Sequence, residues 1–301
     1  RSRVPWVAGR YTGIGETDMT SLEDIVEQIT GQRPTSLTKL AGGSVGDVCR
    51  LDFADGSRIV AKLGEDGSNL NIEGRMLAYL RDNSQLPVPE VLFAAENLLL
   101  LEFIEGENAQ GDAPEMHAAD LLAALHNLTA ENFGLEFDTL IGGLHQPNPP
   151  TKSWLEFFRD QRLLYMAAQA RDAGKLPGDI YDRVEKLGSR LAEFLPATSK
   201  PSLIHGDLWG GNIMAKDNHV SAFIDPAIYY ADAEIELAFS TLFNTFDKLF
   251  FTCYQMHRPL EPDFFEVRRD IYNLYPLLVH VHLFGGSYVG SVDMVLKKFG
   301  V

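Results

Sequence analysis

The sequence predicts an α+β protein with two lobes, in which a small antiparallel sheet with a helix precedes a larger and mainly helical part. Short apolar runs separated by a Gly-rich segment and by Asp55-Gly56 fill residues 36–63, a pattern typical of antiparallel strands joined by tight turns. From Pro114 onward the apolar residues recur with the helical period. We therefore expect an N-terminal lobe over residues 1–104 and a C-terminal lobe over residues 105–301.

The composition limits the kinds of partner that the chain can have. Of its 301 residues 45% are hydrophobic, which is enough for a large buried core, and its net charge is −16. Because nucleic-acid backbones are bound by clustered Lys and Arg, this charge argues against a nucleic-acid partner and suits a neutral or cationic small molecule better. No apolar run reaches the roughly 20 residues that a membrane span needs, so no membrane partner is expected.

The N-terminus and the cysteines predict where the protein resides. The first residues carry no apolar signal-peptide core, and Cys49 and Cys253 have neither metal-ligand nor disulfide-framework spacing. We therefore predict a cytoplasmic protein with two partly buried free thiols. Residues 1–18 show little periodicity and are interpreted as a candidate leader, with Met19 as a natural start.

The N-terminal lobe is predicted to open with a short amphipathic helix over residues 22–29. Ser21 and Asp24 resemble an N-cap pair for this helix, and Gly31 is a stop signal. Three strands follow up to residue 63, and a second helix is predicted over the segment SNLNIEGRMLAYLRD. Two further strands and the end of the lobe are expected in VLFAAENLLLLEFIEGE.

The turn between the first two strands contains Gly42, Gly43 and Ser44. A glycine-rich hairpin lets backbone N–H groups approach triphosphate oxygens without a side chain in the way, although an ordinary tight turn has the same pattern. Lys62, near the end of the third strand, stands in the order expected for a lysine that pairs with ATP phosphates. In the following helix, Glu73 is placed to face the sheet and to form an ion pair with Lys62. The alternative is that Lys62 and Glu73 are both solvent-exposed charges without a functional role.

The C-terminal part is predicted to hold helices over residues 152–173, 179–194 and 231–248, with further helical patterns near the C-terminus. Trp154 belongs to the apolar stripe of the first of these helices, and such a stripe is most often core. His126 shares a helix face with leucines and is interpreted as a packed or hydrogen-bonded residue rather than a ligand. His280 and His282 lie two positions apart, which does not bring them to one helix face and makes them poor metal ligands.

The segment LIHGDLWGGNIMAKDNHVSAFIDPA, residues 203–227, carries the candidate catalytic residues. Phosphoryl transfer requires one carboxylate to orient the attacking hydroxyl and oxygen ligands that hold Mg²⁺ against the phosphates. Asp207 fits the first role, and Asn212 and Asp225 fit the second. Trp209 could support a sugar or a cationic group at the mouth of the site, with burial in the core as the alternative. His205 is interpreted as a residue that packs beneath this loop and orients it.

The motif HGDLWGGN followed by IDPA resembles the fructosamine kinase (ketosamine 3-kinase) family, a branch of the aminoglycoside and choline phosphotransferase group with a protein-kinase-like fold. PNPPTKSW, YADAEIELAFSTLF and HLFGGSYVGS extend the resemblance over most of the chain after residue 20. The resemblance implies that ATP and Mg²⁺ are used, and that the backbone of the linker from Glu102 to Ile104 binds adenine. It also implies that Glu236 braces the catalytic loop. One departure is the longer spacing between Asn148 and Trp154, which argues against a substrate role for Trp154.

The substrate implied by the resemblance is a ketosamine, such as a ribulosamine or fructosamine, free or linked to a protein. Phosphorylation at its O3 would lead to deglycation of the amine. Two alternatives remain at this stage: a kinase for an aminoglycoside, choline or another amino alcohol, and a nucleotide-binding pseudokinase that serves as a scaffold. The presence of every expected catalytic residue argues against the pseudokinase.

Overall fold

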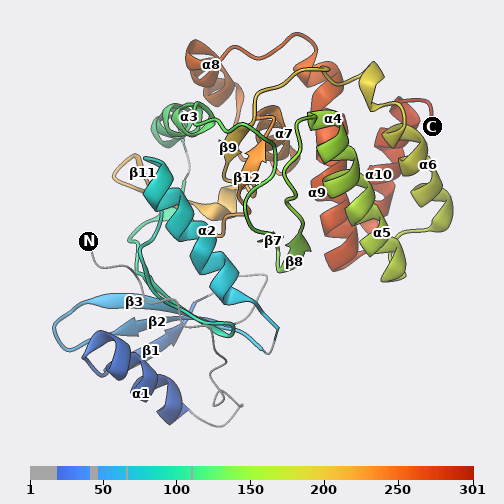
Figure 1. The fold of residues 1–301 in the computed structure, drawn as a ribbon. Coiled ribbons are helices and arrows are strands. Elements are labelled where there is room, and N and C mark those ends of the chain that lie inside the picture. The colour runs from blue at the N-terminus through green and yellow to red at the C-terminus, as the bar shows by residue number, and fades with distance from the viewer. Residues whose placement is uncertain (1–18, 41–46, 66, 110) are drawn as a thin grey trace.

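The computed structural model describes residues 19–40, 47–65, 67–109 and 111–301. A five-stranded antiparallel sheet with two helices forms one end of the molecule, and most of the remaining helices gather at the other end (Figure 1). The sheet has the strand order β1-β2-β3-β5-β4. Its strands are β1 (Ser36–Lys39), β2 (Asp47–Asp52), β3 (Arg58–Leu63), β4 (Val91–Ala94) and β5 (Leu98–Glu102).

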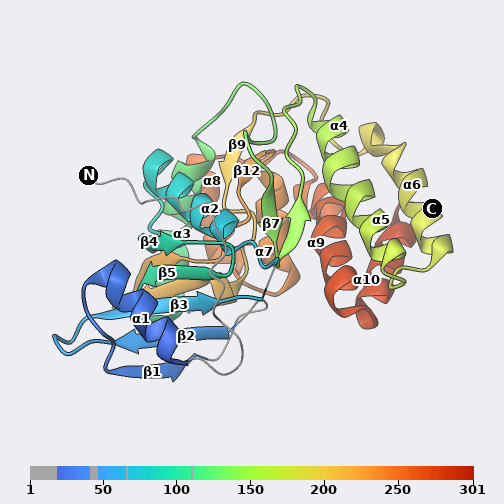
Figure 2. The ribbon, with the colours of Figure 1, turned by 60° about the horizontal axis from the view of Figure 1, so that its bottom comes forward.

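Helices cover both faces of this sheet, which explains the uninterrupted run of leucines in β5. Successive residues of a strand point to opposite faces. Leu98 and Leu100 pack in one core cluster with α1 (Met19–Thr30), whereas Leu99 and Leu101 pack in another with α2 (Leu70–Asn83). Figure 2 shows the two helices on opposite sides of the strands. The predicted N-cap role of Ser21 is wrong, because α1 begins two residues earlier, at Met19.

The second helix, α2, also belongs to the C-terminal part of the molecule. Its Met76 and Leu80 pack into the large core cluster that the C-terminal helices form. The Tyr79 hydroxyl lies 3.3 Å from that of Tyr230, and the guanidinium of Arg75 lies 3.6 Å from the ring centroid of Phe137. Apolar packing, a hydroxyl pair and a cation–π contact therefore tie α2 to residues beyond the sheet.

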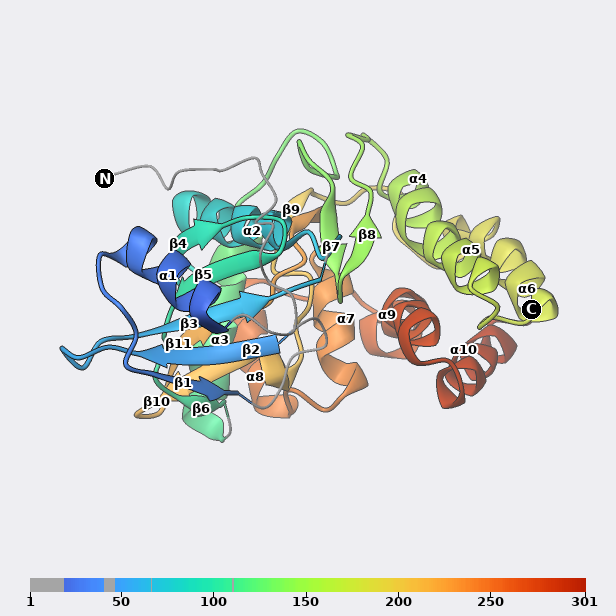
Figure 3. The same cartoon turned by 90° about the horizontal axis from the view of Figure 1, so that it is seen from below.

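The C-terminal part is mainly helical, with small strands at its centre. Its α-helices are α3 (Asp112–His126), α4 (Trp154–Phe157), α5 (Leu164–Asp172), α6 (Gly178–Gly188), α7 (Glu234–Leu242), α8 (Lys248–His257), α9 (Arg269–Phe284) and α10 (Ser287–Lys298). Its strands are β6 (Glu107–Asn108), β7 (Thr139–Ile141), β8 (Leu144–Gln146), β9 (Ser202–Ile204), β10 (Ile213–Lys216), β11 (His219–Phe223) and β12 (Tyr229–Ala231). The β7–β8 hairpin lies between the sheet and the helices α4 and α5 (Figure 3).

Helix boundaries differ from the sequence prediction at three places. The helix expected over residues 152–173 contains a π-helical segment, Phe158–Leu163, between α4 and α5. The helix expected over residues 179–194 ends at Gly188 and continues only as the 3₁₀ turn Leu191–Glu193. The helix expected over residues 231–248 is shorter, Glu234–Leu242 (α7): residue 231 still belongs to β12, and Asn244, just beyond α7, has a left-handed backbone (φ +52°) that no α-helix contains.

Both cysteines are buried and unpaired, as the sequence predicts. Among the helices that the structure describes, none has the length and apolar character required to cross a bilayer.

Candidate active site

The catalytic segment is held by the pairing of two short strands. β9 and β12 are antiparallel, with Ile204 opposite Tyr229, and the N–H of Ala227 donates to the carbonyl of His205 at 2.7 Å. Gly206 follows with φ +89°, and a Cβ at this position would lie 2.0 Å from the Ala227 carbonyl oxygen. Only glycine therefore allows the chain to turn here, and this turn carries Asp207 away from β9.

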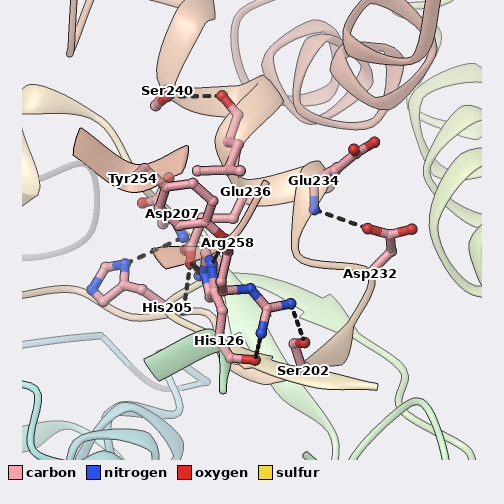
Figure 4. Close-up of polar contacts among 12 residues, drawn as sticks. His126, Ser202, His205, Asp207, Asp232, Glu234, Glu236, Ser240, Tyr254 and Arg258 are labelled. Atoms are coloured by element: carbon pink, nitrogen blue, oxygen red, sulfur yellow. Dashed lines mark hydrogen bonds and ion pairs between the residues drawn. The ribbon is translucent and has the colours of Figure 1, made fainter. Parts of the chain in front are cut away.

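Glu236 of α7 holds the backbone of this turn (Figure 4). Its carboxylate accepts the backbone N–H of Gly206 at 2.7 Å and that of His205 at 3.2 Å. His126 of α3 contacts the same carboxylate through Nε2 at 2.7 Å and the Tyr254 hydroxyl through Nδ1 at 2.8 Å. Burial raises the pKa of Glu236, but the hydrogen bonds and positive partners outweigh burial and hold the pKa below its usual value. The buried carboxylate thus stays ionised, and His126 is the packed, hydrogen-bonded residue that the sequence predicts.

His205 is unsuited to act as a base. Its side chain is fully buried, its Nδ1 accepts the backbone N–H of Asp207 at 3.4 Å, and burial lowers its pKa. Its Nε2 has no hydrogen-bond partner among the residues that the structure describes. The ring therefore lies beneath the loop as a neutral support.

Asp207, which is partly buried, and Asn212, which is buried, lie together after this turn. The amide nitrogen of Asn212 donates to both the backbone carbonyl and the Oδ2 of Asp207, at 2.9 Å in each case. Burial raises the pKa of Asp207 to about 7; the bond from Asn212 opposes this effect, and the charges of Asp225 and Glu236 add to it. A carboxyl group that is fixed in place and titrates near neutral pH has the properties of a general base.

Lys62 connects the sheet to the catalytic segment. Its Nζ lies 2.6 Å from Oε1 of Glu73 in α2 and also contacts the carboxylate of Asp225. Burial lowers the pKa of Lys62, but the two carboxylates outweigh burial and hold the pKa above its ordinary range. The ion pair between Lys62 and Glu73 is thus present as predicted, and it extends to Asp225, which adopts a left-handed backbone at φ +53°.

The oxygen atoms around Asp207 suit a magnesium ion that is shared with phosphates. Because Asn212 turns its amide nitrogen toward Asp207, its Oδ1 is the atom that could ligate a metal, and Asp225 supplies a carboxylate. In the described part of the chain no three His, Cys, Asp or Glu residues form a metal-holding group. Proteins usually hold Mg²⁺ with one or two carboxylates plus substrate phosphates and water, and the oxygen atoms of Asn212 and Asp225 are donors of this kind.

The remaining predicted nucleotide contacts lie partly outside the described residues. This holds for Gly42, Gly43 and Ser44. At the linker, the N–H of Glu102 donates to the carbonyl of Glu90 at 2.9 Å and is therefore not available to adenine. Ile104, two residues later, is partly exposed. The adenine role of Glu102 and Ile104 stays a prediction.

The two candidate tryptophans have opposite environments. Trp154 is buried, and its Nε1 donates to the Tyr272 hydroxyl at 2.9 Å, which in turn donates to Asp232. Trp209 is 43% exposed, and its ring packs over Gly211, where a Cβ would lie 2.2 Å from ring atom Cη2. Trp154 is therefore part of the core, and Trp209 is free to contact a ligand.

Sequence reasoning overlooked one group of residues behind the site. The amide of Gln146 donates to the carbonyl of Ala227 at 3.1 Å and accepts the hydroxyl of Tyr275 at 2.6 Å. Arg162 lies fully buried beside them. The signal in the sequence is Arg162, the second of two arginines in LEFFRDQRLL, which directly precedes two leucines of the apolar stripe.

Comparison with known proteins agrees with this geometry. A sequence model of the fructosamine kinase family matches residues 18–299. The chain is 33% identical to a probable ketoamine kinase of Synechocystis over 282 residues, 91% of this chain and 94% of that protein. It is 31% identical to the chloroplastic protein-ribulosamine 3-kinase of Arabidopsis thaliana over 288 residues, 90% of this chain and 85% of that protein.

Solved structures show the same fold. A Thermobifida fusca crystal structure assigned as a fructosamine-3-kinase superposes with a TM-score of 0.81 at 30% identity, covering 93% of this chain and 99% of that one. An aminoglycoside phosphotransferase in complex with AMP-PNP and hygromycin B superposes with a TM-score of 0.67 at 15% identity, over 93% of this chain and 99% of that one. The predicted fold class, a two-lobed protein-kinase-like fold, is confirmed.

Proposed function

The chain belongs to the fructosamine kinase family, and from this premise we propose that it transfers the γ-phosphoryl group of ATP to O3 of a ketosamine. A ketosamine is a sugar that carries an amine on C1 and a carbonyl at C2. The observation that supports an active kinase most strongly is the contact of Lys62 with both Glu73 and Asp225, close to a carboxylate, Asp207, with a raised pKa. A pseudokinase scaffold would have no need of this set.

Asp207 is the proposed base. As the acceptor oxygen attacks the γ-phosphorus, its proton passes to the Asp207 carboxylate, while the bond from the γ-phosphorus to the bridging oxygen breaks and ADP leaves. Asn212 fixes the carboxylate by its hydrogen bond, and Glu236 fixes the backbone on which the carboxylate stands. Lys62 would pair with ATP phosphates, and backbone N–H groups of Gly42, Gly43 and Ser44 would bind them. Most of the expected rate gain comes from positioning and charge neutralisation.

Asp225 and Asn212 are the proposed Mg²⁺ ligands. Mg²⁺ when bound supplies neutralisation of the negative charge on the phosphate oxygens. Within the chain itself, Asp225 already carries one compensating contact, to Lys62. We expect this lysine to shift toward the phosphates when nucleotide occupies the site, while Glu73 keeps it on the sheet side.

Phosphorylation at O3 would release the amine without a second active site. Enolisation of the C2 carbonyl toward C1 gives an enaminol, whose nitrogen lone pair expels phosphate from C3. Water then hydrolyses the resulting imine, which gives the free amine and a deoxygenated dicarbonyl sugar. The kinase step would therefore select which adducts are removed, and the net charge of −16 would favour approach of amine-bearing substrates only weakly because salt screens it. A cytoplasmic location and the absence of nucleic-acid partners stay predictions.

The proposed activity is tested with a panel of acceptors. The enzyme is incubated with Mg-ATP and ribulosamines, fructosamines, choline or aminoglycosides, and ADP, phosphate and free amine are followed by mass spectrometry. We expect ADP formation with glycated lysine and a delayed, equal release of phosphate and lysine. Phosphorylation of choline or an aminoglycoside with every ketosamine inert would instead establish the alternative substrate class, for which the present support is fold likeness at 15% identity.

The pH profile tests the role of Asp207. Because the base must be ionised and burial raises the pKa of Asp207 to about 7, kcat/KM for the acceptor should fall about tenfold per pH unit below that value and level off above it. ATP binding is measured at each pH as a control, since titration of the nucleotide could produce a similar slope. A kcat/KM that is constant from pH 5 to 8, with ATP binding also constant, would remove Asp207 from this role.

Trp209 is the proposed platform for the sugar or the amine. Stacking or cation–π contact with an exposed indole contributes on the order of 1 kcal/mol, so Trp209→Ala should raise the KM for the acceptor about fivefold and leave the KM for ATP unchanged. Gly211→Ala is a second variant, because its Cβ collides with the ring and must displace it. Equal acceptor KM values for both variants and the wild type would show that the ring does not contact substrate.

A further inference from the structure

Arg162 is a buried cation with an unusual environment. Its side chain is fully buried, and in the residues that the structure describes no carboxylate lies within ion-pair distance of it. The other strongly buried arginine, Arg268, shows the ordinary solution: its guanidinium contacts Glu234 at 2.5 and 2.9 Å. An unpaired buried charge is costly, which points to a role for the guanidinium of Arg162 in holding other groups in place.

The partners of Arg162 are neutral groups from three different elements. Its Nη1 donates to the carbonyl of Pro147 at 2.7 Å, and its Nη2 donates to the Oδ1 of Asn148 at 2.5 Å. The guanidinium carbon lies 3.8 Å from the ring centroid of Tyr229 in β12 and 5.7 Å from that of Tyr275 in α9. Arg162 itself stands in the π-helical segment, and such segments occur frequently at functional sites.

The Asn148 side chain continues the network toward the catalytic loop. Its amide nitrogen donates to the Thr139 hydroxyl at 2.8 Å, and the same hydroxyl accepts the amide of Gln146 at 2.7 Å. Gln146 donates in addition to the carbonyl of Ala227, whose N–H holds the carbonyl of His205. A continuous path of hydrogen bonds thus leads from Arg162 to the residue two positions before Asp207.

A second connection runs through Tyr275. Its hydroxyl donates to Gln146 at 2.6 Å. Burial raises the pKa of this hydroxyl, the charge of Arg162 lowers it and the charge of Asp207 raises it further, so both charged groups act on Tyr275. None of these contacts involves Lys62, Glu73 or the linker that the nucleotide would occupy.

We propose that Arg162 is a positioning residue for the acceptor half of the site: it holds the β8 end, Tyr229 and Tyr275 as one rigid wall, and Gln146 transmits this position to the loop that carries Asp207. The proposal rests on the proposed kinase function. Loss of Arg162 should therefore impair transfer to the acceptor while nucleotide binding stays intact. A purely structural role predicts that both are lost together.

The experiment compares Arg162→Met, Arg162→Lys and Gln146→Met with the wild type. Arg183→Met is the control, since Arg183 donates to Asp293 and to the carbonyl of Val301 at the C-terminal end, away from this network. Tm, the Kd for ATP, and kcat and KM for the acceptor are measured with whichever acceptor the wild type phosphorylates. The comparison therefore remains informative if the ketosamine assignment itself fails.

We expect Arg162→Met and Gln146→Met to lower kcat/KM for the acceptor about 10- to 100-fold, because displacement of a reacting group by about 1 Å has effects of that size. The Kd for ATP should change less than about twofold, and Arg162→Lys should lie between the wild type and Arg162→Met. If Arg162→Met does not fold, the proposal is tested by Gln146→Met alone. Wild-type transfer in Gln146→Met, or equal losses in ATP binding and transfer, would overturn the proposal.

Discussion

Replacement of Asp207 by Asn is expected to lower kcat by about 10²- to 10⁴-fold, the usual contribution of a positioned general base. The substitution removes the proton acceptor but keeps the shape of the side chain and an oxygen for the bond from Asn212. ATP binding should persist, because Asp207 addresses the acceptor hydroxyl and not the nucleotide. Steady-state kinetics and ATP titration by calorimetry measure the two effects separately.

The same variant should be more stable than the wild type at alkaline pH. The folded pKa of Asp207, about 7, lies above the ordinary value of 3.8, so the folded state binds the proton more tightly than the unfolded state. The wild type therefore loses stability as pH rises from 3.8 to 7, whereas the Asn variant does not, because its side chain does not titrate. A Tm at pH 8 that exceeds the wild-type value, together with a collapsed kcat, would identify a carboxylate kept for catalysis at a cost in stability.

The control for this variant is Asp217→Asn, in the exposed turn between β10 and β11. It removes the same charge on the same segment without touching the site. Near wild-type turnover in Asp207→Asn would exclude Asp207 as the base.

Removal of the charge at Asp225 should weaken Mg-ATP binding and lower turnover by at least about 10²-fold, the loss typical for one group that stabilises charge at the reacting centre. Asp225→Asn is the informative variant, because Asn tolerates the left-handed backbone at φ +53° whereas Ala would add strain. Loss of the carboxylate also removes one of the two partners of Lys62.

Metal titrations distinguish a ligand from a structural residue. In the wild type, chelator should abolish activity and Mg²⁺ or Mn²⁺ should restore it, with Zn²⁺ ineffective on hard oxygen ligands. Asp225→Asn should require a higher Mg²⁺ concentration for half-maximal rate. Asp217→Asn is again the matched control, since Asp217 is exposed and has a left-handed backbone, φ +51°. Superimposable Mg²⁺ titrations of Asp225→Asn and the wild type would show that Asp225 is not a ligand.

The parts of the site that could be predicted are those in which local pattern determines the geometry. Helical periodicity places Glu73 on the face of α2 that meets Lys62, and strand alternation points Lys62 toward the same helix. The short spacing from Asp207 to Asn212 leaves little freedom for where the amide can lie. In these cases a few residues along the chain are enough to define a contact in space.

The parts that could not be predicted depend on contacts between distant segments. In the sequence, Arg162 cannot be distinguished from a solvent-exposed arginine on an amphipathic helix. In the structure it lies in the π-helical segment and is fully buried. Trp154 is buried as its place in an apolar stripe predicts, whereas the sequence left both exposure and burial open for Trp209, which is 43% exposed. The end of α7 was missed although Asn244 is of a residue type that favours the left-handed backbone, because an Asn in a sequence does not show by itself that this conformation is adopted.

The attachment of α2 to both parts of the molecule has a consequence for how the enzyme is controlled. In a two-state enzyme, a competent conformation that is populated only as a fraction lowers the apparent affinity for its ligand by that fraction. Here Met76, Leu80 and Tyr79 fasten α2, and with it Glu73, in the arrangement that holds Lys62 in place. We therefore expect the competent conformation to predominate before any nucleotide binds, so that no activator is needed to bring α2 into place. The rate of phosphorylation in the cell would then depend on the concentration of acceptor molecules.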